Sequence, residues 1–408
     1  MNIDTDSVKR VLIQASSLSW SGEKDECCEP WGQSIKINET LRKLSKFFPA
    51  KTLQIIAPKF DETGTLEEII SASGVIMAKP IFSHDNSPLL RMVESTSDLG
   101  ENDYILRING QNCAFHEKNL KQAIELIQVE KTVDVIKFPD DYISQLTFDI
   151  YRVGALRNIA EKYPEPNQIH IHPKHDVGLK RLELPRELHY SQDEMWKIRN
   201  QLSKASTDFR LVNDKAIPSA NQLAFHYEIA TEYLKPNSRV LDLACGAGFG
   251  TRILSKTIDS FDELPSEKSQ LIAGDLNPST LQYSKNQNQD LEVNWQILDA
   301  TDISLPDSSI DFFTCFETLE HVSSLDTALR EFARILAPNG IGFFSTPQNC
   351  FGEIPLTWWH EKEFSFQEIY DAISVHFKIE RFIGIKQGTI FIEGDPIGAN
   401  SFVMVSTK

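Results

Sequence analysis

The sequence of 408 residues contains no apolar run that approaches the ~20 residues needed to span a bilayer. Its N-terminus, MNIDTDSVKR, lacks the apolar segment of a secretory signal peptide. Its six cysteines show no repeated pair spacing, which indicates neither a zinc site nor a disulfide framework. These absences predict a cytoplasmic protein without a membrane span.

Basic residues are also scarce, since 41 Lys and Arg stand against 58 Asp and Glu and the formal net charge is −17. Because phosphate binding is driven by Lys and Arg, this balance argues against nucleic acid as the main partner. No internal repeat or low-complexity segment is present. A hydrophobic fraction of 41% in a chain of this length predicts a globular protein with two domains.

The N-terminal half alternates short apolar runs with amphipathic stretches. The apolar runs predict strands at residues 8–15, 52–57, 74–78, 103–108 and 133–137. Helical spacing of apolar residues predicts helices at residues 37–48, 66–73, 89–97, 119–127 and 153–162. We therefore expect an α/β domain with a mainly parallel sheet covered on both faces.

Three segments of this half resemble the cytidylyltransferases that activate acidic sugars and surface-polysaccharide precursors. They are VLIQAS at the first strand, ENDYILRINGQN in the middle and LKRLELPRELHYSQDEMWKIR near the end. The resemblance implies a nucleotidyltransferase-like mixed α/β fold for residues 1–204.

The same half departs from that family where phosphates and metal are bound. In place of the family's arginines and metal-binding aspartates stand Ser16, Ser17, Ser21, Gln111 and His189. Neither Gln nor His replaces the hard oxygen ligands that hold Mg²⁺. The sequence thus predicts a domain without nucleotidyl transfer, in which Arg107 and Asn109 either contact a ligand or form a strand-end salt bridge.

The C-terminal half follows a polar stretch with a proline, residues 205–220, which predicts an inter-domain linker. Strands are expected at residues 240–243, 271–274, 295–298, 310–316 and 341–345. Helices are expected at residues 221–234, 251–256, 325–336 and within 364–377, and a closing hairpin pairs 378–385 with 401–407. This half is again predicted to be α/β.

The first of these strands ends in a glycine turn within RVLDLACGAGFGTRILSK. A strand that turns on glycines into a helix exposes backbone N–H groups at the positive end of the helix dipole. A dinucleotide site has the spacing G-x-G-x-x-G and an acidic residue ~20 residues farther on. Here the third glycine comes one residue earlier and Asp275 comes later, so the spacing favours a different cofactor.

Five ordered segments resemble the class I S-adenosylmethionine-dependent methyltransferases. They are VLDLACGAGFGT, IAGDLNPSTLQYSK, ILDATDISLPDSSIDFFTCFETLEHV, ALREFARILAPNGIGFFSTPQN and WWHEKEFSFQEIYDAI. The resemblance covers residues 221–408 and implies a Rossmann-like, seven-stranded domain. It also implies S-adenosyl-L-methionine as the cofactor.

From this resemblance we expect several cofactor contacts at the glycine turn. Asp242 should bind the amino group of the cofactor, directly or through water, and order the loop. Gly246, Gly248 and Gly250 should let the backbone approach its methionine and ribose portions. His226 lies where the family often has an arginine near the cofactor carboxylate, and an ordinary surface histidine is an equal alternative.

Further cofactor contacts are expected at the ribose and the adenine. Asp275, at the tip of the second strand, should accept both ribose hydroxyls, with a helix N-cap as the alternative. Leu276 is suited to pack on the adenine ring. Asp299 should accept from the adenine amino group, or else cap a turn, and Ala300 should add a backbone contact.

Glu317, Glu320 and His321 follow the fourth strand, where the transferring methyl should lie, and Glu317 is also assigned to the cofactor site. A helical turn would put them on one face. His321 then acts as a general base, or the segment binds a divalent metal as in resembling quinone methyltransferases, or it caps a helix. No metal ligand is assigned. A second candidate base lies among Trp358, Trp359, His360 and Glu361.

Together these features predict a methyltransferase that acts on an oxygen of a sugar, nucleotide-sugar or surface-glycan precursor. The sugar acceptor follows from the N-terminal resemblance alone. That acceptor is the expected partner, and a homodimer is compatible with the sequence. Two alternatives stay open: an enzyme whose N-terminal half also transfers a nucleotidyl group, and an N-terminal half that only binds or recruits.

Overall fold

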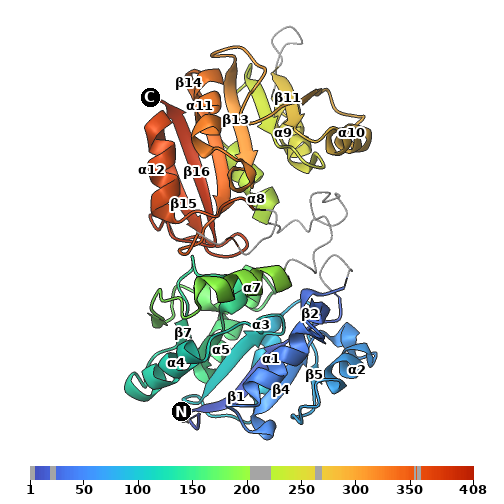
Figure 1. Cartoon of the computed structure of the whole chain (residues 1–408), viewed down its shortest axis with the longest axis vertical. Helices are drawn as coiled ribbons and strands as arrows, with labels where there is room; N and C mark the ends of the chain where they lie inside the picture. Colours follow the sequence, from blue (N-terminus) through green and yellow to red (C-terminus); the bar gives the residue numbers. More distant parts are fainter. Residues whose placement is uncertain (1–4, 19–23, 203–221, 262–268, 353–354, 356–359) are drawn as a thin grey trace. The chain divides into compact units, whose positions relative to one another are not determined.

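The computed structural model describes residues 5–18, 24–202, 222–261, 269–352, 355 and 360–408 (Figure 1). The chain forms two compact units, Met1–Ala205 and Ser206–Lys408, and each contains a seven-stranded sheet. The α/β class predicted from the sequence is confirmed. Among the described helices, none has the length and apolar character needed to cross a membrane.

The sheet of the N-terminal unit has the strand order β5-β4-β1-β6-β8-β7-β9. Its strands are β1 (Val8–Gln14), β4 (Leu53–Ala57), β5 (Ile81–Phe82), β6 (Tyr104–Asn109), β7 (Val135–Lys137), β8 (Asp149–Arg152) and β9 (Arg181–Glu183). A separate small hairpin joins β2 (Pro30–Trp31) and β3 (Ser34–Ile35). β1 pairs in parallel with β4 and β6, whereas β8 runs antiparallel to β6 and β7. The sheet is therefore mainly parallel, with β8 as the antiparallel strand.

Seven helices of this unit are described: α1 (Lys36–Leu44), α2 (Thr65–Ser71), α3 (Pro88–Ser95), α4 (Glu117–Val129), α5 (Val153–Lys162), α6 (Gln168–Ile171) and α7 (Gln192–Leu202). The predicted strand at residues 74–78 is wrong, since no strand occurs there and the edge strand is β5. Gly74 has a left-handed φ of 69°, and Ile76 is 81% exposed. The apolar run is therefore not buried in a sheet.

The sheet of the C-terminal unit has the strand order β12-β11-β10-β13-β14-β16-β15. Its strands are β10 (Arg239–Leu243), β11 (Gln270–Asp275), β12 (Asn294–Ile297), β13 (Ile310–Phe316), β14 (Leu336–Pro347), β15 (Phe377–Ile385) and β16 (Asn400–Thr407). β10 to β14 pair in parallel, and β16 runs antiparallel to β14 and β15. The predicted closing hairpin is confirmed. β14 begins five residues before the predicted strand, because Leu336 is extended and already pairs with Ile310 of β13.

The described helices of this unit are α8 (Gln222–Thr231), α9 (Phe249–Asp259), α10 (Pro278–Gln287), α11 (Leu325–Ile335) and α12 (Phe366–His376). Neighbouring residues of β13 point to opposite faces of the sheet, as a strand requires. Phe313 packs with apolar residues of α11 and α12, whereas Phe312 packs with those of α8 and α9. The sheet is thus covered on both faces, which leaves the carboxyl edge of its parallel strands as the place for a site.

Candidate cofactor and acceptor site

The glycine turn joins β10 to α9 through left-handed backbone positions. Gly246 has a φ of 52° and Gly248 a φ of 83°, which glycine adopts without a steric cost. The N–H of Gly246 donates to Asp275 Oδ2 at 3.1 Å, so the turn is tied to the end of β11. A Cβ on Gly248 would lie 2.2 Å from Ser284 Oγ. Both glycines are therefore required by the shape of the turn.

Gly250 is required for a different reason from the one expected. A Cβ at this position would lie 1.9 Å from Cζ of Tyr227, whose ring packs against the start of α9. Close packing of α8 on α9 therefore explains this glycine without a ligand. Its contribution to the cofactor site stays a prediction.

Asp242 is fully buried at the centre of the unit and accepts three hydrogen bonds. The donors are the hydroxyls of Tyr227 at 2.8 Å, Thr251 at 2.6 Å and Thr314 at 2.9 Å. Burial raises the pKa of Asp242 to about 6, although the three hydroxyls oppose that shift. The carboxyl group joins α8, α9 and β13. Its predicted role in ordering the glycine loop stays a prediction. Binding of the cofactor's amino group stays a prediction.

The end of β11 presents the residues expected at the ribose and the adenine. Asp275 Oδ1 accepts from the N–H of Asn277 at 2.9 Å, and the neighbouring Leu276 is 62% exposed. The N-cap of α10 is Asn277, whose side chain accepts from two backbone N–H groups. The alternative that Asp275 is the N-cap is therefore wrong, while its ribose contact stays a prediction.

Asp299 lies just after β12 and already caps a turn. Its Oδ1 accepts from the N–H of Thr301 at 2.8 Å and from the hydroxyl of Thr301 at 2.7 Å. Ala300, next to it, is buried. Asp299 therefore caps a turn, as the alternative interpretation holds. The contacts of Asp299 and Ala300 with the adenine stay predictions.

His226 is fully buried, so the alternative of a surface histidine is wrong. Its ring packs against the rings of Phe316 and Phe402, with a centroid distance of 5.4 Å to each. Neither ring nitrogen has a hydrogen-bond partner within the described chain. Burial lowers the pKa of His226 to about 3, so the imidazole is neutral at physiological pH. The predicted contact to the cofactor carboxylate stays untested.

Glu317 does not share a helical face with Glu320 and His321, contrary to the prediction. Its left-handed φ of 49° precedes a single 3₁₀ turn, Leu319–His321, so the helical spacing rule does not apply. The side chain instead accepts from Ser345 Oγ at 2.7 Å and from Asn400 Nδ2 at 2.9 Å. Burial raises its pKa. Glu317 therefore links the carboxyl end of β13 to β14 and β16.

Glu320 is the most deeply buried member of this cluster, with 1% exposure. Its Oε2 accepts from Thr346 Oγ1 at 2.8 Å, whereas Oε1 has no hydrogen-bond partner within the described chain. Oε1 lies 3.8 Å from Nε2 of His321. Burial, and then the charge of Glu317, raise the pKa of Glu320 well above its usual range. An unpaired buried carboxyl oxygen is costly unless a cation faces it.

The structure brings His360 to His321 from a distant part of the chain. The two rings are 4.9 Å apart between centroids and inclined at 75°. Glu320, His321 and His360 each offer one ligand atom, and these atoms lie within 4.8 Å of one another. Two imidazoles and a carboxylate whose Oε1 accepts no hydrogen bond within the described chain fit a divalent cation. No metal ligand was predicted from the sequence, because the spacing of the residues did not show that His360 lies beside Glu320 and His321.

The partner of His360 is Glu363 and not the predicted Glu361. His360 Nδ1 lies 2.8 Å from Glu363 Oε1, while Glu361 is exposed. The i, i+3 spacing within H-E-K-E is the signal that could have indicated this pair. Trp358 and Trp359, the expected sugar-stacking residues, lie outside the described residues.

Several residues predicted as remnants of a nucleotide site in the N-terminal unit bond to other side chains of that unit. Ser16 Oγ and the N–H of Ser17 both donate to Asp61. Arg107 donates to Gln14 Oε1 at 2.7 Å and lies 3.5 Å from Asp149. The strand-end salt bridge expected as one alternative for Arg107 is therefore present. Ser21 lies outside the described residues, and the side chain of His189 is buried at 3.4 Å from Glu187.

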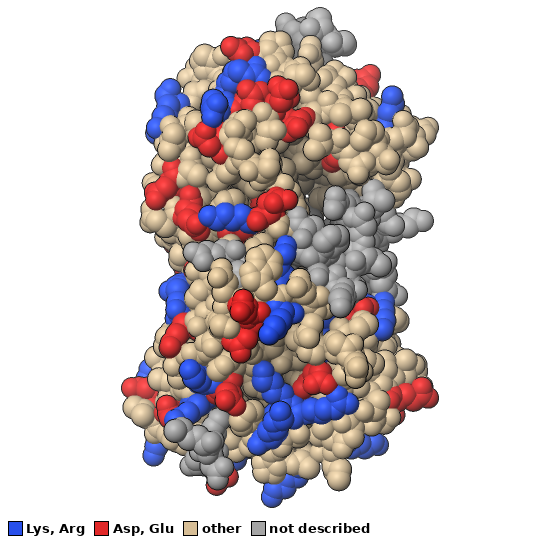
Figure 2. All heavy atoms as spheres, in the orientation of Figure 1, with Lys and Arg blue, Asp and Glu red and all other residues tan. Residues whose placement is uncertain are grey.

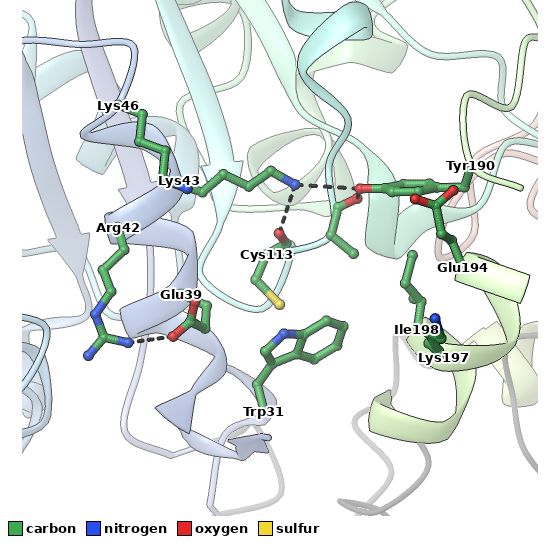
Figure 3. Close-up of a pocket in the computed structure, with 11 residues that line it drawn as sticks. Trp31, Glu39, Arg42, Lys43, Lys46, Cys113, Tyr190, Glu194, Lys197 and Ile198 are labelled. Atoms are coloured by element: carbon green, nitrogen blue, oxygen red, sulfur yellow. Dashed lines mark hydrogen bonds and ion pairs between the residues drawn. The ribbon is translucent and has the colours of Figure 1, made fainter. Parts of the chain in front are cut away.

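A cavity of about 370 Å³ lies elsewhere in this unit, between α1, α7 and the loop after β6 (Figure 3). Basic side chains gather over α1 on the face shown in Figure 2, and Arg42 and Lys43 line the cavity with Trp31. Burial lowers the pKa of Lys43 to about 8, and its amine donates to backbone carbonyls and lies 3.5 Å from the Tyr190 hydroxyl. No motif in the sequence indicated this cavity.

Residues 241–344, which begin within β10 and end within β14, match the family model described as "Methyltransferase domain". The C-terminal unit carries a class I methyltransferase domain. S-adenosylmethionine is the cofactor of this domain. The match begins at Leu241 in β10 and includes Glu320 and His321 but ends before His360.

Curated relatives match the methyltransferase domain over part of their length. A ubiquinone/menaquinone biosynthesis C-methyltransferase of Pseudoalteromonas translucida is 27% identical over 164 residues, which are 38% of this chain and 62% of that protein. A 2-phytyl-1,4-naphtoquinone methyltransferase of Synechococcus elongatus is 30% identical over 131 residues, 31% of this chain and 53% of that protein. The chain thus spans less than two thirds of the length of these relatives.

Solved methyltransferase structures are similar to part of the chain. A SAM-dependent methyltransferase from Aquifex aeolicus is 21% identical, with a TM-score of 0.34, and the match covers 44% of this chain and 88% of that one. A TehB-like SAM-dependent methyltransferase from Corynebacterium glutamicum is 16% identical, with a TM-score of 0.34 and coverage of 45% and 88%.

Proposed function

We propose that the chain transfers the methyl group of S-adenosylmethionine to a hydroxyl oxygen of a small-molecule acceptor. The observation that carries this proposal is the buried carboxyl of Glu320 beside the imidazoles of His321 and His360. This cluster follows β13, and the glycine turn follows β10, its parallel neighbour in the sheet. Neighbouring strands lie ~4.8 Å apart. The cofactor that donates the methyl group and the molecule that accepts it would therefore bind at the same edge of the sheet.

Methyl transfer is an in-line displacement in which the methyl–sulfur bond breaks as the methyl–oxygen bond forms. Alignment supplies most of the rate, and a hydroxyl acceptor also has to lose its proton. The side chain of His321 is 37% exposed and can take that proton. In the alternative arrangement, Glu320, His321 and His360 would hold a divalent cation. The lone pair of His321 would then bind the ion, and the ion would lower the pKa of a hydroxyl beside it so that its proton passes to water.

We extend the proposal to the acceptor, which is a sugar, a nucleotide-sugar or a surface-glycan precursor. The proposal also includes a glycan partner and a homodimer. Support for the sugar comes only from the resemblance of the N-terminal half to cytidylyltransferases. A second candidate is methyl transfer to a ring carbon of a quinone. It is favoured by the names of two curated relatives, a ubiquinone/menaquinone biosynthesis C-methyltransferase and a naphtoquinone methyltransferase.

The position of the transferred methyl group distinguishes these two candidates. The protein is incubated with S-adenosylmethionine that carries a ¹³C methyl, together with sugars, nucleotide-sugars or a demethylated quinone. We expect a new methoxy signal in the carbon NMR spectrum of the product, because the cluster is suited to deprotonating a hydroxyl. A ring-methyl signal on the quinone would overturn the oxygen assignment and support the second candidate.

We further propose that the N-terminal unit, about residues 1–204 joined by a linker at 205–220, has a nucleotidyltransferase-like fold without that activity. Gln111 and His189 occupy the places of metal-binding aspartates in the resembling family, and Ser16 and Ser17 are bonded to Asp61. With CTP, Mg²⁺ and acidic sugars we therefore expect no pyrophosphate above the level of a protein-free control. Rapid release would restore the bifunctional alternative.

A further inference from the structure

We infer that Glu363 is a positioning residue, which presents His360 to a divalent ion of the zinc, iron, cobalt or nickel class. The inference rests on the proposed function, in which Glu320, His321 and His360 hold a cation. To the proposed function the inference adds the class of the ion. It also adds Glu363, a residue that no sequence motif indicated. Its basis is the hydrogen-bonding around Glu363, a side chain that is buried beside His360.

Glu363 is held from both sides by groups that donate hydrogen bonds. Its Oε1 lies 2.8 Å from Nδ1 of His360, and its Oε2 accepts from Nδ2 of Asn349 at 2.8 Å. The amide of Asn349 is oriented in turn, because its Oδ1 accepts from the N–H of Phe351 at 2.8 Å. The backbone N–H of Asn349 donates to the carbonyl of Phe364. Two donors therefore face the two oxygens of Glu363.

This arrangement determines which nitrogen of His360 would bind an ion. A carboxylate that accepts from Nδ1 keeps the ring proton there, so the neutral ring carries its lone pair on Nε2. A glutamine at position 363 has one oxygen and one amide nitrogen. That nitrogen would face a donor, either Nδ1 of His360 or Nδ2 of Asn349. The site thus requires a carboxylate at Glu363.

The donor set indicates the class of ion. His321 and His360 supply imidazole nitrogens and Glu320 supplies a carboxylate oxygen. Mg²⁺ and Ca²⁺ prefer oxygen ligands, and Mg²⁺ keeps several waters, whereas imidazole suits zinc, iron, cobalt and nickel. A set in which nitrogen outnumbers oxygen, with a hydrogen-bonded carboxylate behind one imidazole, favours the latter ions.

Co²⁺ is a suitable probe because its visible absorption reports the ligands and their geometry. Co²⁺ is titrated into the full chain after removal of metal, and binding is followed by absorption and calorimetry. We expect one ion per chain, which millimolar Mg²⁺ does not displace. Glu363→Gln should weaken Co²⁺ binding by ~10- to 100-fold and shift the absorption bands. Glu363→Asp, which keeps a carboxylate, should recover part of that loss.

Asp371→Asn is the matched control, since it makes the same acid-to-amide change on the exposed surface of α12. Equal affinity and an identical spectrum in Glu363→Gln would overturn the positioning role. Absence of Co²⁺ binding, or its displacement by Mg²⁺, would overturn the ion class. Oxygen methylation by a protein that binds no Co²⁺ would overturn the inference and leave the transfer to oxygen intact. Normal Co²⁺ binding without oxygen methylation would overturn only the proposed function.

Discussion

Replacing His321 by alanine should lower the turnover of methyl transfer by ~10²- to 10⁴-fold, the usual contribution of a positioned acid or base. The side chain lies beside the buried carboxyl of Glu320 and the ring of His360, at the edge where the acceptor hydroxyl is proposed to lie. The affinity for S-adenosylmethionine should stay unchanged, because the glycine turn and Asp275 are on other strands. Turnover with saturating cofactor and calorimetric affinity are measured on the same preparation.

His360→Ala should likewise lower the turnover and leave the affinity for S-adenosylmethionine unchanged, since His360 belongs to the same cluster. His376→Ala is the control, because His376 lies at the end of α12 and bonds to the exposed Asp326. Full turnover in both the His321 and the His360 variants would show that neither imidazole takes part in the reaction. The cluster would then be structural, as the helix-capping interpretation holds.

The second large effect is expected at Asp275, where alanine should weaken S-adenosylmethionine binding by ~10- to 150-fold. The change removes the proposed acceptor of two ribose hydroxyls, and hydrogen bonds to a charged group contribute ~1.5–3 kcal/mol. It also removes the contact that Asp275 makes with the N–H of Gly246. Affinity is measured by calorimetry, and circular dichroism shows whether the fold is kept.

Asp275→Asn separates the ribose contact from the turn contact, because asparagine retains one acceptor oxygen. It should lose less affinity than alanine does. Asp371→Ala removes an exposed carboxylate on α12 and should leave the affinity unchanged. Unchanged binding in Asp275→Ala would contradict the ribose assignment.

The parts of the site that depend on local sequence could be predicted. A buried strand, glycines at left-handed positions and a following helix are determined by neighbouring residues, and Gly246 and Gly248 lie in such positions. The carboxyl-edge location of Asp275 follows from the strand that precedes it. The α/β alternation of both halves likewise depends on the period of apolar residues.

The parts that depend on tertiary packing could not be predicted. Gly250 faces the ring of Tyr227, a contact set by how α8 lies on α9 and not by the turn. The burial of His226 arises from Phe402 on β16, far along the chain. The meeting of His321 with His360 depends on the same long-range packing. The left-handed backbone of Glu317 has no signal in the residue type.

The apolar run that predicted a strand at residues 74–78 shows the limit of reading hydrophobicity alone. Such a run forms a strand when a partner strand covers it, and here Ile76 is exposed while Ile81 pairs with Ile56 of β4. The strand that pairs with β4 is therefore β5, which lies a few residues later in the chain than the predicted strand.

The central claim is that the glycine turn between β10 and α9 binds the methyl donor of a working methyltransferase. Calorimetric titration of S-adenosylmethionine into the full-length protein tests it most directly. The account predicts saturable binding of one molecule per chain, weakened in Asp275→Ala and unaffected in His321→Ala. Absence of binding, or binding that Asp275→Ala does not weaken, would contradict it.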